Sequence, residues 1–188
     1  MSSEELLPKI NEILDRAKQL GFTMSCDTET GQLLRVLAGS KRKGDFLELG
    51  TGAGLSTLWL LDGMDAASRL ISIEMDESIQ HIARTCIHDA RVEFISMDGG
   101  MFIEENKSKK FDLIFADTWP GKFYLLEETL AMVKPGGYYI IDDLRPIETW
   151  PDDHREKVQS LVSTMRNLED FYVVELNCST GLILATRK

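Results

Sequence analysis

The chain has 188 residues, 43% hydrophobic and 28% charged, which is typical of one globular domain. Its 31 acidic residues outnumber 21 basic ones, and the net charge of −10 disfavours a broad nucleic-acid face. No apolar run reaches the roughly 18 residues of a membrane span, and the acidic N-terminus lacks the pattern of a secretory signal. Three cysteines form no CxxC pair. We therefore expect a cytoplasmic protein with free thiols and no nucleic-acid or membrane partner.

Hydrophobic spacing predicts the secondary structure in chain order. Helices are expected at 4–20 and 28–38, before a region in which short apolar runs alternate with helical patterns. The runs predict strands at 46–49, 69–73, 92–96, 111–116 and 138–141. A glycine loop and a helix through residue 61 follow the first strand, and later helices are expected at 76–88, 100–106, 123–133 and 152–168. Two last strands, at 171–176 and 182–186, are too close for a crossover helix and should pair antiparallel.

This alternation predicts an α/β fold. We expect a Rossmann-like, seven-stranded, mostly parallel sheet with a C-terminal antiparallel strand and helices on both faces. No internal repeat or linker is present, so the sequence predicts one domain over 1–188. Within it, residues 1–44 would form an N-terminal helical cap and residues 45–188 the cofactor-binding sheet.

The strongest local signal is the segment ELGTGAGLS at 48–56, where the first strand ends and a helix starts. Glycines there let the backbone approach a ligand at the edge of the sheet where α/β proteins bind ligands. Glu48 would repel the pyrophosphate of a dinucleotide, although Glu74 lies 20 residues beyond Gly54, as a dinucleotide site also requires. Carboxylates mark the ends of the first four strands: Glu48, Glu74, Asp98 and Asp117.

Several further motifs occur in order along the chain. They are MSC at 24–26, TGQLL at 30–34, FLELGTGAGLS at 46–56, IE at 73–74, FAD at 115–117, KPGG at 134–137, IDD at 141–143 and TGLIL at 180–184. With these motifs the chain resembles the class I S-adenosylmethionine-dependent methyltransferases. Among them it is most similar to the cation-dependent O-methyltransferases of the catechol and caffeoyl-CoA type. The resemblance implies S-adenosyl-L-methionine as the cofactor.

The resemblance also implies which residues bind this cofactor. Glu74 would accept hydrogen bonds from the two ribose hydroxyls, and Asp98 and Gly99 would lie beside the adenine. The other implied cofactor residues are Met24, Ser25, Cys26, Glu48, Gly50, Thr51, Gly52, Ser56 and Asp117. For four of these an ordinary structural role is the alternative: Glu74 could be a solvated strand end, Asp98 could cap a helix, Ser56 could be a plain first-turn residue, and Met24 could fill the core.

A divalent cation is implied at Asp117, Asp142 and Asp143, because carboxylate oxygens suit Mg²⁺, Ca²⁺ or Mn²⁺. The alternative is that Asp142 or Asp143 caps a turn without a metal. Lys122 is the candidate general base beside Asp117. It follows Asp117 two residues later than the family pattern, so a solvated lysine is the alternative.

Residues after the strand ends could shape the substrate pocket. Trp119 and Trp150 are candidate walls of this pocket, and the segment 144–151 is a candidate rim. A packing role in the core or in a loop is the alternative for each tryptophan.

The prediction is an O-methyltransferase that transfers a methyl group to a hydroxyl of a small molecule with the help of a divalent cation. The length leaves no room for a separate substrate domain, which favours a small acceptor, and related enzymes are often dimers, so a homodimer is expected. Three alternatives stay open: a metal-independent methyltransferase acting on another heteroatom, an NAD-dependent oxidoreductase, and a non-catalytic cofactor-binding protein.

Overall fold

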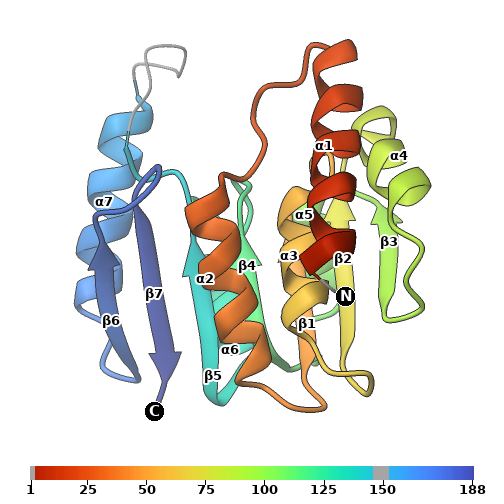
Figure 1. Cartoon of the computed structure of the whole chain (residues 1–188). Coiled ribbons are helices and arrows are strands. Elements are labelled where there is room, and N and C mark those ends of the chain that lie inside the picture. The colour runs from red at the N-terminus through yellow and green to blue at the C-terminus, as the bar shows by residue number, and fades with distance from the viewer. Residues whose placement is uncertain (1–2, 146–152) are drawn as a thin grey trace.

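The computed structural model describes residues 3–145 and 153–188, which form one twisted sheet flanked by helices (Figure 1). In the described ranges the sheet has seven strands in the order β3-β2-β1-β4-β5-β7-β6. The strands are β1 Asp45–Leu49, β2 Arg69–Glu74, β3 Val92–Ser96, β4 Phe111–Ala116, β5 Val133–Ile141, β6 Phe171–Leu176 and β7 Leu182–Arg187. Only β7 runs antiparallel to its neighbours, β5 and β6. The predicted Rossmann-like architecture is confirmed.

The helices cover both faces of the sheet (Figure 1). They are α1 Ser3–Gln19, α2 Thr28–Gly39, α3 Leu55–Gly63, α4 Glu77–Cys86, α5 Gly99–Glu105, α6 Leu126–Ala131 and α7 His154–Arg166. Residues of β4 alternate between two cores, since Phe115 packs with α1–α4 and Ile114 packs with α5–α7. No helix in the described part of the chain is both long and apolar enough to cross a membrane.

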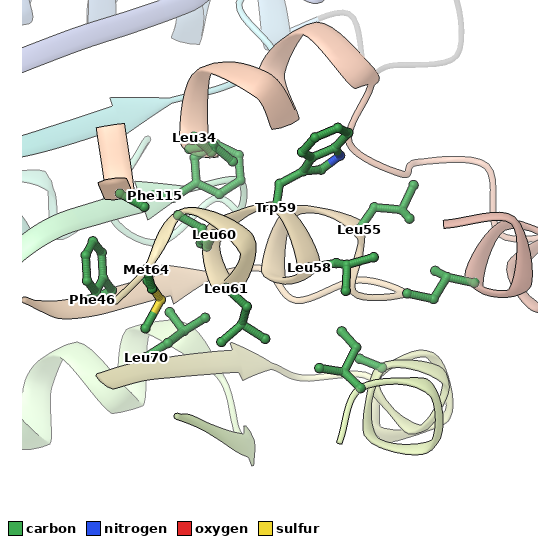
Figure 2. Close-up of a cluster of buried hydrophobic side chains, with 14 of the residues drawn as sticks. Leu34, Phe46, Leu55, Leu58, Trp59, Leu60, Leu61, Met64, Leu70 and Phe115 are labelled. Carbon is green, nitrogen blue, oxygen red and sulfur yellow. The ribbon is translucent and has the colours of Figure 1, made fainter. Parts of the chain in front are cut away.

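Helix α3 is buried along most of its length and carries the glycine loop at its start. Its residues from Leu55 to Leu61 are all buried, and Figure 2 shows Trp59 and Leu60 beside Leu34 of α2. A side chain at Gly31 of α2 would lie 2.2 Å from Trp59 Cδ1, so glycine lets the two helices approach. A helix that is apolar all round needs cover on its outer side, which α1 and α2 provide.

The largest departure from the predicted elements lies between residues 123 and 141. The predicted helix at 123–133 is shorter, because Leu125 adopts a left-handed backbone (φ 55°) and α6 begins only after it. Strand β5 begins at Val133 instead of Tyr138 and includes Pro135 and Gly136. The pairing with β4 shifts register there, an irregularity at which a strand tolerates proline.

Candidate functional site

Three adjoining cavities lie at the carboxyl ends of the central strands. The aromatic cavity, about 490 Å³, is lined by Glu74, Asp98, Trp119 and Tyr124 among others. The loop cavity, about 190 Å³, is lined by the glycine loop and by residues 22 and 24–26. The acidic cavity, about 460 Å³, is lined by Asp27, Asp117, Asp142, Asp143 and Thr180 among others. Gly50, Glu74 and Thr118 border the first two cavities, and Asp117 and Asp143 border the last two.

The glycine loop is held tightly over the end of β2. Gly50 and Thr51 both donate their amide hydrogens to the Ile73 carbonyl, at 2.9 and 3.0 Å. Gly50 has a φ of 104°, and a Cβ there would lie 2.9 Å from the Asp117 carbonyl oxygen. Glycine is therefore required where the loop passes the end of β4.

Glu74 stands between the aromatic and loop cavities with its carboxylate fixed by two backbone amides. Oε2 accepts a hydrogen bond from the Gly52 amide at 2.9 Å, and Oε1 accepts one from the Asp76 amide at 3.1 Å. Each carboxylate oxygen can accept a second hydrogen bond. Glu74 can therefore receive two hydroxyl groups of one ligand without losing its own anchoring contacts.

Glu48 lies beneath the loop instead of lining any of the three cavities. Its carboxylate is fully buried and accepts hydrogen bonds from the hydroxyls of Thr57 and Ser72. Burial raises its pKa from 4.5 to about 7, although the hydroxyl donors act in the opposite direction. The predicted direct cofactor contact of Glu48 is therefore replaced by support of the loop from below.

A buried polar network extends from Glu48 to the surface. Ser72 is also within hydrogen-bond distance of Thr51, at 2.6 Å, and Thr51 accepts a hydrogen bond from Gln80 Nε2 at 3.0 Å. Gln80 Oε1 in turn accepts hydrogen bonds from Arg84 and Ser96. The position of the loop thus depends on side chains of α4 and β3 as well as on its own glycines.

The remaining predicted cofactor residues mostly line the cavities. Met24, Ser25 and Cys26 border both the loop and acidic cavities, and Thr51, Gly52 and Ser56 line the loop cavity. Ser25 Oγ is buried and has no hydrogen-bond partner within the described residues. Such an orphaned hydroxyl is suited to a polar ligand group. Burial, followed by the nearby aspartates, raises the pKa of Cys26 well above its ordinary value, so the thiol stays protonated.

Asp98 has the capping role that the sequence left open, and its place beside the adenine stays a prediction. It caps α5 by accepting a hydrogen bond from the Met101 amide at 3.0 Å, and it also lines the aromatic cavity beside Gly99.

Sequence reasoning missed Tyr124, because it lay inside a predicted helix, and Phe22, which preceded any recognised motif. Tyr124 lines the aromatic cavity and Phe22 lines the other two.

Trp119 lines the aromatic cavity, next to Glu74 and Asp98, and is not among the residues that line the acidic cavity. The residue is 46% exposed, and its ring packs under the Lys157 ammonium, which lies 4.2 Å from the ring centroid. The other predicted wall, Trp150, lies outside the described residues, as does the predicted rim from 146 onward.

The acidic cavity gathers carboxylates from three parts of the chain. Burial and then repulsion from Asp143 and Asp142 raise the pKa of Asp117 well above its ordinary value. Asp142 is 3% exposed, and its pKa rises to about 6, chiefly through burial. Its Oδ1 accepts hydrogen bonds from the Thr180 hydroxyl and from the Asp143 amide. Asp27 caps α2 from the cavity wall by accepting a hydrogen bond from the Thr30 amide.

The predicted metal ligands lie around one cavity. Asp117, Asp142 and Asp143 border one cavity, but the described residues contain no group of three His, Cys, Asp or Glu side chains that could hold an ion. Asp142 Oδ1 is engaged by Thr180 and by the Asp143 amide. The role of these three aspartates as metal ligands stays a prediction.

Lys122 is buried, so its alternative interpretation as a solvated lysine is wrong. Only 4% of the residue is exposed, and burial lowers the pKa of its ammonium. The turn that holds it is fixed on both sides: its amide donates to the Trp119 carbonyl, and the Tyr139 hydroxyl donates to the Gly121 carbonyl. Lys122 does not itself line the acidic cavity, but it interacts electrostatically with Asp117, Asp142 and Asp143.

The fold and the glycine-loop site are those of a methyltransferase. Residues 47–144, slightly more than half of the chain, match the family model described as a methyltransferase domain. The chain therefore belongs to this family.

Individual relatives agree with this assignment. A protein of Mycolicibacterium vanbaalenii that is provisionally named an O-methyltransferase is 32% identical over 117 residues, which cover 59% of this chain and 52% of the relative. The chain thus spans about half the length of these curated relatives. 

Two solved structures share the fold over nearly the whole chain. An O-methyltransferase from Bacillus cereus in complex with SAH has a TM-score of 0.81 and 24% identity, covering 100% of this chain and 92% of its own. The O-methyltransferase TomG from Streptomyces achromogenes, in complex with SAM, has a TM-score of 0.79 and 20% identity, covering 100% and 91%.

Proposed function

We propose that this protein is an S-adenosylmethionine-dependent O-methyltransferase that acts on a hydroxyl group of a small molecule. The observation that carries the proposal is the continuity of the aromatic and loop cavities, which share Gly50, Glu74 and Thr118. A ligand with an aromatic base, a vicinal diol and an amino-acid tail would place these three parts in the aromatic cavity, at Glu74 and in the loop cavity, in that order. When bound, S-adenosylmethionine supplies a methyl group on a positively charged sulfur.

The residues of the site suit each part of that ligand. Trp119 and Tyr124 offer ring faces or edges to the adenine, and Glu74 offers its two carboxylate oxygens to the ribose. The tail would lie in the loop cavity, where Ser25 Oγ has no partner among the described residues. Asp117 borders the same cavity, and its charge suits an amino group or a sulfonium.

The same features argue against the nicotinamide alternative. A pyrophosphate at the loop would need the free amides of the helix start. Here the Gly52 amide is already bonded to the Glu74 carboxylate, and Asp117 also lines the cavity. Both carboxylates would repel a pyrophosphate.

The acceptor would lie in the acidic cavity, which adjoins the loop cavity through Ser25, Asp117 and Asp143. At about 460 Å³ this cavity matches a small molecule. Its carboxylates can accept a hydrogen bond from the acceptor hydroxyl and so hold its oxygen in line with the methyl group. In the transfer the new O–C bond would form as the S–C bond breaks with its electron pair remaining on sulfur, and the hydroxyl proton would pass to the cavity carboxylate that accepts its hydrogen bond. The predicted role of Lys122 as general base has no support from the cavity lining. The cation-assisted version of the reaction stays a prediction.

Calorimetry with S-adenosylhomocysteine and with NAD tests the proposal. We expect the first to bind and the second not to bind, and the reverse result would contradict the proposal. A panel of small hydroxyl acceptors with radiolabelled methyl donor then tests catalysis. Cofactor binding without transfer to any acceptor would favour the non-catalytic alternative, and transfer only to nitrogen or sulfur acceptors would favour another heteroatom. The homodimer and the cytoplasmic location stay predictions.

A further inference from the structure

The turn between β6 and β7 is hydrogen-bonded to the start of α2, and Figure 1 shows both at the same edge of the sheet. The Thr30 hydroxyl donates to Ser179 Oγ at 2.9 Å, although the two residues are 149 positions apart in the chain. The Ser179 amide donates to Glu29 Oε2 at 3.2 Å, and the Ser179 hydroxyl donates to the Asp27 carboxylate. These three hydrogen bonds form the Ser179 latch, which fastens the C-terminal hairpin to the N-terminal part of the chain.

The turn that carries Ser179 is anchored on its other side by Arg145. The guanidinium donates from Nη1 to the Ser179 carbonyl at 3.2 Å and from Nη2 to the Asn177 carbonyl at 2.8 Å. The Arg145 amide donates to the Thr180 carbonyl at 2.7 Å. Ser179 has a left-handed backbone (φ 54°), which a residue with a Cβ keeps only where surrounding contacts hold it. The turn is therefore a fixed support for the latch.

The segment 23–26, which lies directly before the latch, has no comparable support of its own. Its backbone forms no hydrogen bond with any residue in the described part of the chain. The fixed points on its two sides are Phe22, whose amide donates to the Ala17 carbonyl at 2.9 Å, and Asp27 in the latch. A segment without internal backbone hydrogen bonds opens easily unless its ends are held. The position of residues 23–26 thus depends on the bond between Asp27 and Ser179.

This segment borders only one part of the proposed cofactor site. Met24, Ser25 and Cys26 line the loop cavity and are not among the residues that line the aromatic cavity. The Ser25 hydroxyl, which has no partner among the described residues, belongs to the same wall. A displacement of the segment would therefore change the surroundings of an amino-acid tail in the loop cavity and leave those of an adenine unchanged.

We propose that Ser179 is a positioning residue for the cofactor, which holds residues 24–26 against the amino-acid tail by fastening Asp27 to the β6–β7 turn. The inference rests on the proposed function, because it needs that cofactor in the loop cavity. Ser179 itself lines none of the three cavities, so it acts through Asp27 and not by contact with the ligand.

The first test compares two ligands by calorimetry: S-adenosylhomocysteine, and 5′-methylthioadenosine, which has the same nucleoside and sulfur but no amino-acid tail. Ser179→Gly removes the hydroxyl and suits the left-handed backbone. We expect its affinity for S-adenosylhomocysteine to fall about tenfold, because the segment must then be ordered on binding. Its affinity for 5′-methylthioadenosine should not change. An equal loss for both ligands, or no loss for either, would overturn the inference.

The matched control is Lys43→Gly, which places glycine at another exposed left-handed position (φ 53°) outside the latch. Both of its affinities should equal those of the wild type. The wild type also separates the two proposals. If it does not bind S-adenosylhomocysteine, the proposed function fails. If it binds this ligand and Ser179→Gly binds it equally well, the inference alone fails.

The second test removes the latch from its other end. Thr30 is fully buried, and Thr30→Val takes away the donor to Ser179 while nearly keeping the volume of the side chain. We expect a smaller loss of affinity, again for S-adenosylhomocysteine alone. Combined with Ser179→Gly it should add no further loss, since both act through one set of contacts. Additive losses would contradict the inference. If Ser179→Gly does not fold, Thr30→Val decides alone, and a loss shared by both ligands, or none, overturns the inference.

Discussion

The Gly52 amide donates a hydrogen bond of 2.9 Å to Oε2 of Glu74, which joins the glycine loop directly to the end of β2. The bond places a carboxylate at the boundary between two cavities and orients it with the backbone instead of with another side chain. Since the loop is itself held by Ile73 and by the buried network below it, Glu74 and the loop form one hydrogen-bonded unit. A site preorganised in this way loses little entropy on binding a ligand.

Replacing Glu74 should weaken binding of the ribose more than that of any other part of the cofactor. Glu74→Gln keeps one acceptor oxygen but loses the charge, and we expect S-adenosylhomocysteine affinity to fall by about 10–100-fold, as for a lost hydrogen bond to a charged group. Calorimetry measures the change. The wild type should also bind the 2′-deoxy analogue more weakly than the ribose form.

The variant should lose most of that preference for the ribose form. Glu77→Gln, at an exposed position in the first turn of α4, is the matched control and should leave both affinities unchanged. Equal discrimination between the two ligands by wild type and Glu74→Gln would show that Glu74 does not contact the ribose.

Much of the fold and part of the site follow from local sequence. Strands β3, β4 and β6 lie where their apolar runs predict them, because a charged residue directly precedes each run. Glu74 could be placed at a strand end beside the glycine loop, since both features are local. The start of β5 could not be predicted, because its first residues are held by pairing of Val133 with Phe111 across the sheet. Local propensity at Pro135 and Gly136 opposes a strand.

The hydrogen bonds and burial of the acidic residues depend on tertiary contacts, which the spacing of residues along the sequence does not reveal. The sequence placed Asp142 at the end of a strand, but its engagement by Thr180 is made by the hairpin between β6 and β7, 38 residues further along the chain. Similarly, the burial of Lys122 results from the turn around Gly121 and from Phe123 packing against His154 of α7. No pattern within the loop itself distinguishes this lysine from a solvated one.

Gln80 should support both stability and cofactor binding through the buried network. It is fully buried, and its Nε2 donates to Thr51 Oγ1 and to the carbonyls of Ser72 and Ile95. Gln80→Leu leaves these acceptors without their donor, and we expect unfolding to become easier by about 2–3 kcal/mol. Urea denaturation monitored by circular dichroism measures this loss.

The substitution should also weaken S-adenosylhomocysteine binding, because Thr51 would be released from below. Gln159→Leu, at an exposed position on α7, makes the same chemical change without a buried partner and should alter neither quantity. A destabilised Gln80→Leu protein with wild-type affinity would show that the loop keeps its position without the network.

Glu48 should make the stability of the protein depend on pH between about 4.5 and 7. Its pKa is raised from 4.5 to about 7 in the folded state, chiefly by burial, so the folded protein holds a proton that the unfolded chain releases. The stabilising contribution is therefore complete below about pH 4.5 and is lost as the pH rises through 7.

Glu48→Gln cannot ionise and can still accept hydrogen bonds from Thr57 and Ser72. Relative to wild type, the variant should gain stability as the pH rises, by up to about 3 kcal/mol at pH 8, from 1.36 kcal/mol per pKa unit. Urea unfolding at a series of pH values measures the difference, and Glu104→Gln at an exposed position of α5 should show no such trend. A constant difference between Glu48→Gln and wild type across this range would mean that the buried carboxyl group does not change its protonation on unfolding.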